Sequence, residues 1–212
     1  MIDLYRESLI LQAWFSPAFP TGGFAYSHGV ESAIEKGLIS DATTLYEWLY
    51  YLLVEGSGQN DGIFITAALN GQTDINELYL CLCAGTDRQR EALEMGQAFT
   101  RTINADYEAT LPDGLAYPIA IGLAAKQMRL DGRLTIQSYL QAFISNLISV
   151  GVRLIPIGQQ AGQHCLISLF PILVKLSEKI CTASLDQLGN SAFLSDLMTL
   201  QHESSKIKVY RT

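Results

Sequence analysis

Apolar residues recur at helical spacing along most of the chain. The repeat of three and four residues is clearest at 45–52 and at 136–150. No stretch shows the sustained alternation of polar and apolar residues that indicates a strand, and no internal repeat is visible. We therefore predict an all-α single domain, a bundle of about nine or ten helices by the spacing of the apolar repeats.

Proline, glycine and candidate capping residues divide this pattern into elements. Gly56 to Gly62 combines glycine with small polar residues, which predicts a loop. Pro171 falls inside a late apolar series and is expected to kink or interrupt it. The first expected helix ends near Phe15. The others are expected to cover 24–36, 41–55, 63–70, 75–83, 86–103, 117–128, 135–150, 165–180 and 185–202.

The segment 135–150 is predicted to be a central helix buried on nearly every side. Between Arg133 and Lys175 the only charged residue is Arg153, if His164 is counted as neutral. A membrane-spanning helix is excluded because neutral polar side chains recur along one stripe. That stripe is Gln137, Gln141, Ser145, Asn146 and Ser149.

Composition narrows the classes of protein further. The chain has 212 residues, enough for one sizeable core, and only 17% are charged, against about 25% in an average soluble domain. So little charge favours a buried interface, and we expect a homodimer. The net charge of −7 disfavours nucleic-acid binding. The acidic N-terminus is unlike a secretory signal, and the four cysteines are expected to be buried and reduced, so we expect a cytoplasmic protein.

Residues 14–31 form the most distinctive stretch of the chain. Pro17 and Pro20 prevent the first helix from continuing, and the Gly22–Gly23 pair allows a bend. Aromatic residues crowd around that bend, which predicts a packed elbow. Its exit helix carries a small polar set, Ser27, His28 and Glu31.

No catalytic, metal-binding or cofactor-binding set emerges from this elbow. Adjacent Ser27 and His28 would point about 100° apart on a helix, so they do not form a nucleophile and base. His28 and Glu31 would share a face three residues apart, but a metal site needs about three or four ligands. A helix-surface or hydrogen-bonded His28–Glu31 pair is the simpler interpretation, and His164 is interpreted as a core histidine. A small helical enzyme working at His28 and Glu31 remains the alternative.

Three separate stretches resemble the urease accessory protein UreF family. They are Ser-Pro-Ala-Phe-Pro-Thr-Gly-Gly-Phe-Ala-Tyr-Ser-His-Gly-Val-Glu at 16–31, Gly-Val-Arg-Leu-Ile-Pro-Ile-Gly-Gln-Gln at 151–160 and the ending at 202–212. In that ending Lys208 replaces an arginine of the family pattern, Tyr210 a phenylalanine and Thr212 a serine. A weaker similarity lies at Glu91-x-x-x-Met95-Gly96.

The resemblance implies a non-catalytic helical protein, not an enzyme, with no cofactor of its own. Such a protein would bridge a UreD/UreH-type scaffold and the UreG-type GTPase, and so serve nickel insertion into the urease apoprotein. The family is typically dimeric. By position, Glu31 and Arg153 would face the GTPase. The residues that the resemblance marks for partner binding are Tyr26, Ser27, His28, Glu31, Arg153, Pro156, Gly158, Gln159, Gln160, His202, Lys208, Tyr210 and Arg211.

Two further expectations concern surfaces. We divide the chain into a helical domain at 1–202 and a docking tail at 203–212, which is short, polar and expected to be mobile until a scaffold binds. Arg153 is either a core residue paired with a carboxylate or a surface residue at a helix end. The glycine and proline around it favour the surface. A general helical adaptor unrelated to urease is the second alternative.

Overall fold

The structure, a computed structural model, describes residues 2–212, with side chains from Tyr5 onward. Within these residues there are ten α-helices, two short 3-10 helices and no strand, so the predicted all-α single domain is confirmed. In chain order the elements are α1 (Ile2–Trp14), η1 (Gly23–Ala25), α2 (Val30–Glu35), α3 (Ala42–Glu55), α4 (Ser57–Leu69), α5 (Asn76–Leu82), α6 (Thr86–Asp106), α7 (Tyr117–Gln127), α8 (Gly132–Leu154), α9 (Gly158–Ile180), η2 (Leu185–Gln187) and α10 (Phe193–Glu203).

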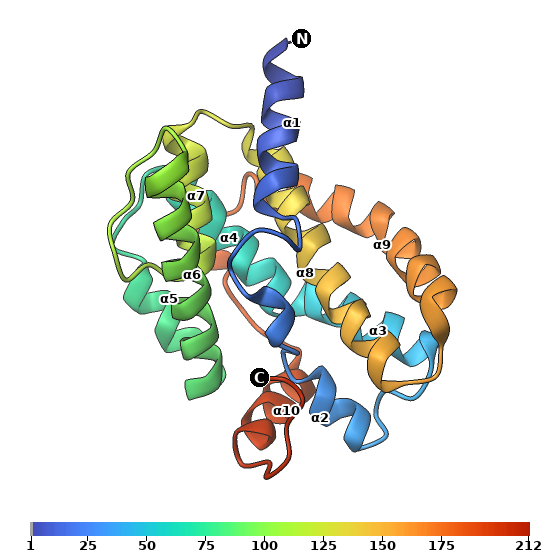
Figure 1. Ribbon diagram of the computed structural model, residues 1–212. Helices are drawn as coiled ribbons and strands as arrows, with labels where there is room; N and C mark the ends of the chain where they lie inside the picture. The colour runs from blue at the N-terminus through green and yellow to red at the C-terminus, as the bar shows by residue number, and fades with distance from the viewer. Residues whose placement is uncertain (1) are drawn as a thin grey trace.

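Helix α8 lies in the middle of the molecule (Figure 1). It contacts α9 along its length, and α1, α2, α3, α4 and α7 surround much of the rest. Ile136, Leu140 and Ile144 on this helix are fully buried, whereas Gln141 is exposed. The hydrophobic face predicted for 135–150 is therefore the wall on which the other helices pack.

The expected helix over 24–36 is wrong, because the chain breaks before Val30. Residues 23–25 form one 3-10 turn, and His28 and Gly29 then have positive φ angles of 56° and 79°. Gly29 precedes α2 and does not lie inside a helix. A Cβ atom at Gly29 would lie 3.0 Å from the carbonyl oxygen of Ser195, so the backbone of α10 packs closely against this glycine.

The loop predicted at 56–62 is also wrong. Helix α4 begins at Ser57, directly after a sharp change of direction at Gly56. Glycine serves close packing here, because a Cβ atom at Gly62 would lie 2.7 Å from Ile180 on α9. Small residues that suggest a loop by composition can instead mark a helix pressed against its neighbours.

Several single-residue expectations are corrected as well. Helix α9 continues through Pro171, so of the two expected effects the interruption is absent. His164 on the same helix is exposed rather than in the core. All four cysteines are free; Cys165 is buried as expected, but Cys81 is exposed. Among residues 2–212 no helix combines the length and the apolar character that a membrane crossing requires.

Candidate functional site

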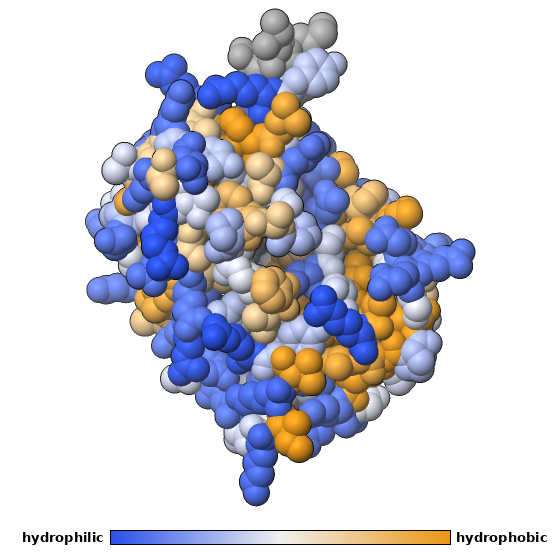
Figure 2. All heavy atoms as spheres, in the orientation of Figure 1, coloured by the Kyte–Doolittle hydropathy of each residue, from blue (hydrophilic) through white to orange (hydrophobic). Residues whose placement is uncertain are grey.

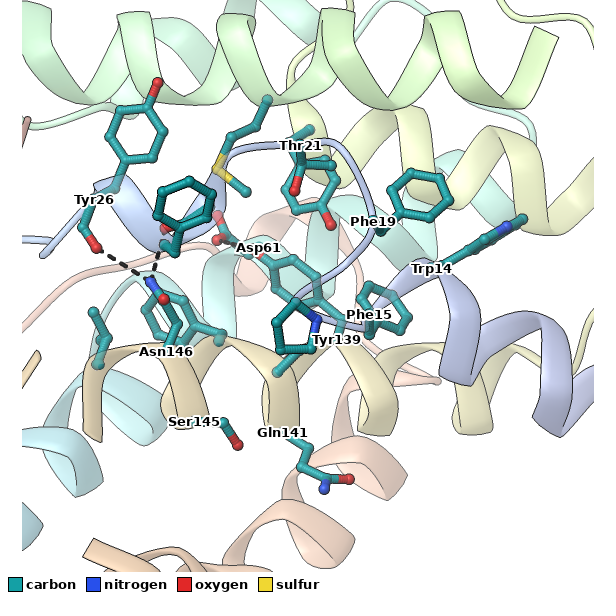
Figure 3. Close-up of a pocket in the computed structure, with 18 of the residues that line it drawn as sticks. Trp14, Phe15, Phe19, Thr21, Tyr26, Asp61, Tyr139, Gln141, Ser145 and Asn146 are labelled. Atoms are coloured by element: carbon teal, nitrogen blue, oxygen red, sulfur yellow. Dashed lines mark hydrogen bonds between the residues drawn. The ribbon is translucent and has the colours of Figure 1, made fainter. Parts of the chain in front are cut away.

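The elbow between α1 and α2 is held against α8 by a single amide side chain. Asn146 Nδ2 donates to the carbonyl oxygens of Gly23, at 2.9 Å, and Tyr26, at 3.1 Å (Figure 3). Aromatic side chains of the elbow complete the packing, with the rings of Phe19 and Phe99 5.6 Å apart. The predicted packed elbow is therefore present, and it lies directly over the central helix.

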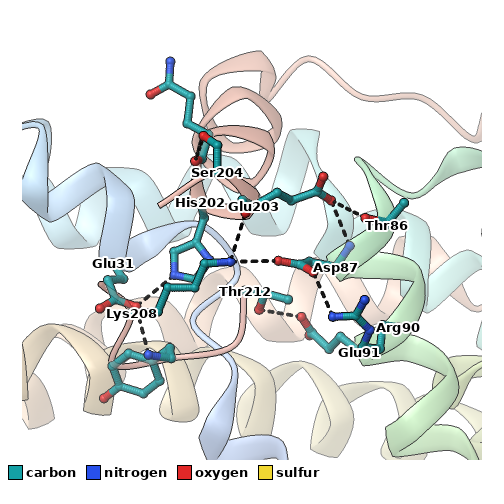
Figure 4. Close-up of polar contacts among 12 residues, drawn as sticks. Glu31, Thr86, Asp87, Arg90, Glu91, His202, Glu203, Ser204, Lys208 and Thr212 are labelled. Atoms are coloured by element: carbon teal, nitrogen blue, oxygen red, sulfur yellow. Dashed lines mark hydrogen bonds and ion pairs between the residues drawn. The ribbon is translucent and has the colours of Figure 1, made fainter. Parts of the chain in front are cut away.

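Glu31 ties the C-terminal segment to this elbow. Its side chain is buried, and it accepts hydrogen bonds from the backbone N–H groups of Val209, at 2.7 Å, and Tyr210, at 2.9 Å (Figure 4). His202 Nε2 donates to the same carboxylate at 2.9 Å. Glu31 thus pairs with His202 and the tail, and the predicted His28–Glu31 pair is wrong.

The remaining tail residues are also bonded to the body of the protein. Thr212 accepts a hydrogen bond from Ser27 N–H at 3.1 Å, and its hydroxyl donates to Glu91 at 2.8 Å. Arg211 Nη1 lies 2.6 Å from a Glu94 carboxylate oxygen and 3.3 Å from the Tyr26 hydroxyl. The tail packs against the elbow and α6.

Glu203, at the end of α10, caps the start of α6 from a distant part of the chain. Its Oε1 accepts from Asp87 N–H at 2.8 Å and from the Thr86 hydroxyl at 3.1 Å (Figure 4). Lys208 Nζ lies 3.4 Å from the Asp87 carboxylate. The donor groups at a helix N-terminus favour a carboxylate, and they lower the pKa of Glu203 below its usual value.

Beneath the tail lies a buried cluster of charged and polar side chains. Arg88 and Glu91 form an ion pair, and His28 Nδ1 lies 3.5 Å from Glu91 while its Nε2 is hydrogen-bonded to Ser57 at 2.7 Å. Burial by itself would raise the pKa of Glu91, but the charges of Arg88 and His28 outweigh it and lower that pKa to about 2. Glu91 is therefore an ionised hub inside the protein.

Asp61 on α4 belongs to the same interior but has a different environment. The hydroxyls of Tyr79 and Tyr139 donate to its two carboxylate oxygens at 3.0 and 2.5 Å. Burial raises the pKa of Asp61, and this effect exceeds the opposing influence of Arg88 and of the two tyrosine hydrogen bonds. Two buried carboxyl groups thus have pKa values shifted in opposite directions.

A cavity of about 620 Å³ lies between the elbow, the buried charged cluster and α8 (Figure 3). Its inner end is lined by His28, Asp61 and Glu91, and its sides by aromatic residues of the elbow and by α8. Arg153, the residue expected at the surface, also lines it. The volume falls in the range of small-ligand and peptide pockets, and the lining combines apolar walls with a few polar groups.

The residues that the resemblance marked for partner binding fall into two sets. Arg153 is exposed, as predicted, and its Nη1 lies 3.4 Å from the Tyr210 hydroxyl, so 151–160 and the tail do meet. The buried set is Tyr26, Ser27, His28, Glu31, His202 and Tyr210. The exposed set is Arg153, Pro156, Gly158, Gln159, Gln160, Lys208 and Arg211.

Segments far apart in the chain therefore converge, although not completely. The elbow, Arg153 and the tail are linked by hydrogen bonds, whereas the side chains of Pro156, Gln159 and Gln160 have no polar contact with the tail among the described residues. The buried set holds the elbow and the tail in position by hydrogen bonds and is not itself exposed.

Sequence reasoning missed the residues that α4 and α6 contribute to the cluster. The composition around Asp61 predicts a loop, and no local pattern marks Glu203, whose partner on α6 lies more than a hundred residues away. Arg88 pairs with Glu91 only three residues further along α6, but this spacing alone does not show that the pair is buried. The similarity at Glu91-x-x-x-Met95-Gly96 was the available signal. Gly96 lets the chain before α7 pack against α6, since a Cβ atom there would overlap the Leu115 carbonyl oxygen.

The chemistry of the site is that of a structural cluster. In the part of the chain that the structure describes, no group of three or more histidine, cysteine, aspartate or glutamate side chains could hold a metal ion. Glu31 and Glu91 are each bonded to the C-terminal segment, through His202 and Thr212, and Arg88 is paired with Glu91 on the same helix. Fold and site together define an all-helical protein in which a buried polar cluster joins the elbow, α6 and the C-terminal segment.

Comparison of the sequence with known proteins shows the family to which this helical protein belongs. The UreF family model matches residues 39–170. The urease accessory protein UreF of Ruegeria pomeroyi is 37% identical over 212 residues, covering 98% of this chain and 97% of that protein. UreF of Dinoroseobacter shibae is 38% identical over 206 residues, covering 96% and 98%. The chain belongs to the urease accessory protein UreF family.

Proposed function

We propose that this protein is a non-catalytic maturation factor that bridges a UreD/UreH-type scaffold and a UreG-type GTPase. In this role it governs GTPase-coupled delivery of nickel to the urease apoprotein, in the cytoplasm, without a metal or cofactor of its own. Membership of the UreF family supports the proposal. The observation that carries it is the hydrogen-bonded meeting of the three stretches that resemble the family, at 16–31, 151–160 and 202–212.

Arg153 is the contact that we assign to the GTPase. It is exposed at the C-terminal end of α8, beside Tyr210 of the tail. Phe24, which is 62% exposed on the elbow, lines the same cavity. Arginine and aromatic side chains are enriched at protein interfaces and among the residues that contribute most to binding energy.

The docked tail is the contact that we assign to the scaffold. Ile207 and Val209 are 83% and 70% exposed even though the backbone of the tail is bonded to Glu31. A scaffold protein would therefore meet two apolar side chains on a segment whose conformation is already set. A pre-positioned segment loses less conformational entropy on binding than a mobile one.

Reconstitution with purified partners tests the bridge. The intact chain is expected to recruit the GTPase to the scaffold, measured by size-exclusion chromatography with light scattering. Arg153→Ala should still bind the scaffold but lose the GTPase. Because Arg153 is exposed, its removal should change the free energy of unfolding by less than about 0.5 kcal/mol.

Arg101→Ala is the matched control, because Arg101 is exposed on α6 and has no side-chain partner among the described residues. It should recruit the GTPase as the unmodified chain does. Failure of the intact chain to join the two partners would refute the bridge. A large drop in melting temperature for Arg153→Ala would instead show that Arg153 is needed for folding, and would cancel its assignment to the GTPase.

A further inference from the structure

The outer side of α8 carries a row of polar side chains that the protein itself does not use. Ser138, Gln141, Ser145 and Ser149 line the cavity, and none has a side-chain hydrogen bond to another residue of the described chain. We call this row the α8 stripe. Figure 3 shows Gln141 and Ser145 on the side of α8 away from the elbow, so the cavity extends from the buried cluster to the surface of the helix.

Asn146 shows what this surface of α8 does with a neighbouring chain. Its amide donates to two backbone carbonyl groups of the elbow, which is an irregular segment lying across the helix. The stripe offers further amide and hydroxyl groups beside this contact. Such neutral groups match the N–H and C=O groups of an extended backbone, whereas a partner helix would already have satisfied its own.

The inner end of the cavity also contains an unsatisfied polar atom. His28 is 4% exposed, and its Nδ1 has no hydrogen bond, the nearest carboxylate oxygen being that of Glu91 at 3.5 Å. Buried polar atoms without partners are rare in folded proteins. The cavity is therefore polar at its inner end, where His28 Nδ1 faces Glu91 without a hydrogen bond, as well as along its mouth.

We propose that the α8 stripe binds an extended segment of the GTPase, with an acidic residue of that segment against Arg153. This inference rests on the proposed function. Arg153 lines the same cavity and supplies the positive charge at one end of the stripe. The stripe is about 16 Å long at the helical rise per residue, which matches about five residues of extended chain. Phe15 and Phe24 line the same cavity from the elbow.

Gln141→Leu in the intact complex is the direct test. It keeps a side chain of similar bulk and removes its donor and acceptor, so groups on the bound segment lose their partner. The expected result is a roughly tenfold weaker GTPase affinity, measured by calorimetry with the scaffold-bound chain, and an unchanged scaffold affinity. Gln141 is exposed, so the melting temperature should not change.

Gln137→Leu is the matched control. Gln137 is a half-buried glutamine one turn earlier on α8 that does not line the cavity, so its replacement should leave GTPase affinity within about twofold. A second measurement replaces Ser145 by the photo-crosslinker p-benzoylphenylalanine. It is expected to link to one short, non-helical stretch of the GTPase that contains an aspartate or glutamate.

The outcomes separate the two proposals. If Gln141→Leu behaves like Gln137→Leu while Arg153→Ala loses the GTPase, the bridge stands and the segment-binding stripe is wrong. Crosslinks confined to a helix of the GTPase would also overturn the stripe. If the intact chain binds no GTPase in the presence of scaffold, both proposals fail.

Discussion

At the scale of single residues, Glu31 is the side chain on which the C-terminal segment depends. It is 2% exposed and accepts three hydrogen bonds, two of them from the backbone of the tail. Burying a carboxylate is unfavourable unless donors surround it, and here the donors come from a segment almost 180 residues away. The carboxylate and the tail therefore hold each other in place.

Glu31→Ala should destabilise the protein by about 3 kcal/mol or more, because two backbone N–H groups and His202 lose their acceptor. Urea unfolding measures the loss, and amide exchange at Val209 and Tyr210 should accelerate. Glu35→Ala, an exposed glutamate on the same helix, is the control and should cost less than about 0.5 kcal/mol. Equal losses for the two variants would contradict this role of Glu31.

The two buried carboxyl groups should respond to pH in opposite ways. The pKa of Glu91 is lowered to about 2, so its contribution to stability is present above its usual value of 4.5 and is lost as pH falls toward 2. The pKa of Asp61 is raised. Its contribution is present below the usual value of 3.8 and is lost as pH rises through the folded-state pKa.

Asp61→Asn isolates the second effect, because it removes the ionisation and keeps an acceptor for one of the two tyrosine hydroxyls. Relative to the unmodified chain, the variant should gain stability as pH rises from 3.5 to 7, measured by urea unfolding at each pH. Asp196→Asn is an informative comparison, since burial also raises the pKa of this half-exposed aspartate. A pH-independent difference between Asp61→Asn and the unmodified chain would refute the raised pKa.

At the scale of elements, α6 and α10 depend on one another. The N-terminus of α6 follows Gly85 and has no side-chain cap from its own segment. Glu203 at the end of α10 takes that place, and the φ of 91° at Gly85 is one that favours glycine. The C-terminal helix therefore completes a helix that begins more than a hundred residues earlier.

Glu203→Ala should lower the free energy of unfolding by about 1 kcal/mol, the usual effect of losing a helix cap. Thermal unfolding by circular dichroism measures it, and Glu203→Gln should restore part of the loss because its amide oxygen can still accept. Gln201→Ala is the control, since Gln201 is exposed on the same helix. If Gln201→Ala were as destabilising as Glu203→Ala, the cap would not be the cause.

This distant cap shows which elements the sequence can predict. Apolar spacing over 136–150 predicts the central helix because the pattern is local, and α8 covers that range. The break at His28–Gly29 was not predictable, because it depends on the close packing of Gly29 against α10. The start of α4 at Ser57 was not predictable either, because its glycines serve close packing, as Gly62 does against α9. Likewise Glu31 and Arg153 could be named from sequence, but their partners His202 and Tyr210 could only be paired by the fold.

At the scale of the whole molecule, polar and apolar surfaces are unevenly distributed. Arg153, Arg211 and Phe24 lie around the elbow and the tail, where the three stretches that resemble the family meet. Figure 2 shows hydrophobic side chains grouped on parts of the surface rather than scattered evenly. For a chain with only 17% charged residues, such groups indicate where further protein surface is covered.

The outer face of α10 is the strongest such surface and leads to the last prediction, a homodimer. Four apolar side chains on this helix are between 46% and 73% exposed; they are Phe193, Leu194, Leu197 and Leu200. Clustered exposure of this kind is unusual for a monomer, and a second copy would bury the face on both subunits. The chain should therefore be a dimer at micromolar concentration, measured by light scattering.

Replacing Leu194 and Leu197 with glutamate should weaken association by at least about tenfold, because the dimer would then have to bury two charges in place of two apolar side chains. Folding should be retained, since both side chains point into solvent in the single chain. Ile167→Glu on the exposed side of α9 is the matched comparison. If that variant dissociates the dimer and the α10 variant does not, the interface lies on α9; if the unmodified chain is a monomer at high micromolar concentration, the homodimer itself is excluded.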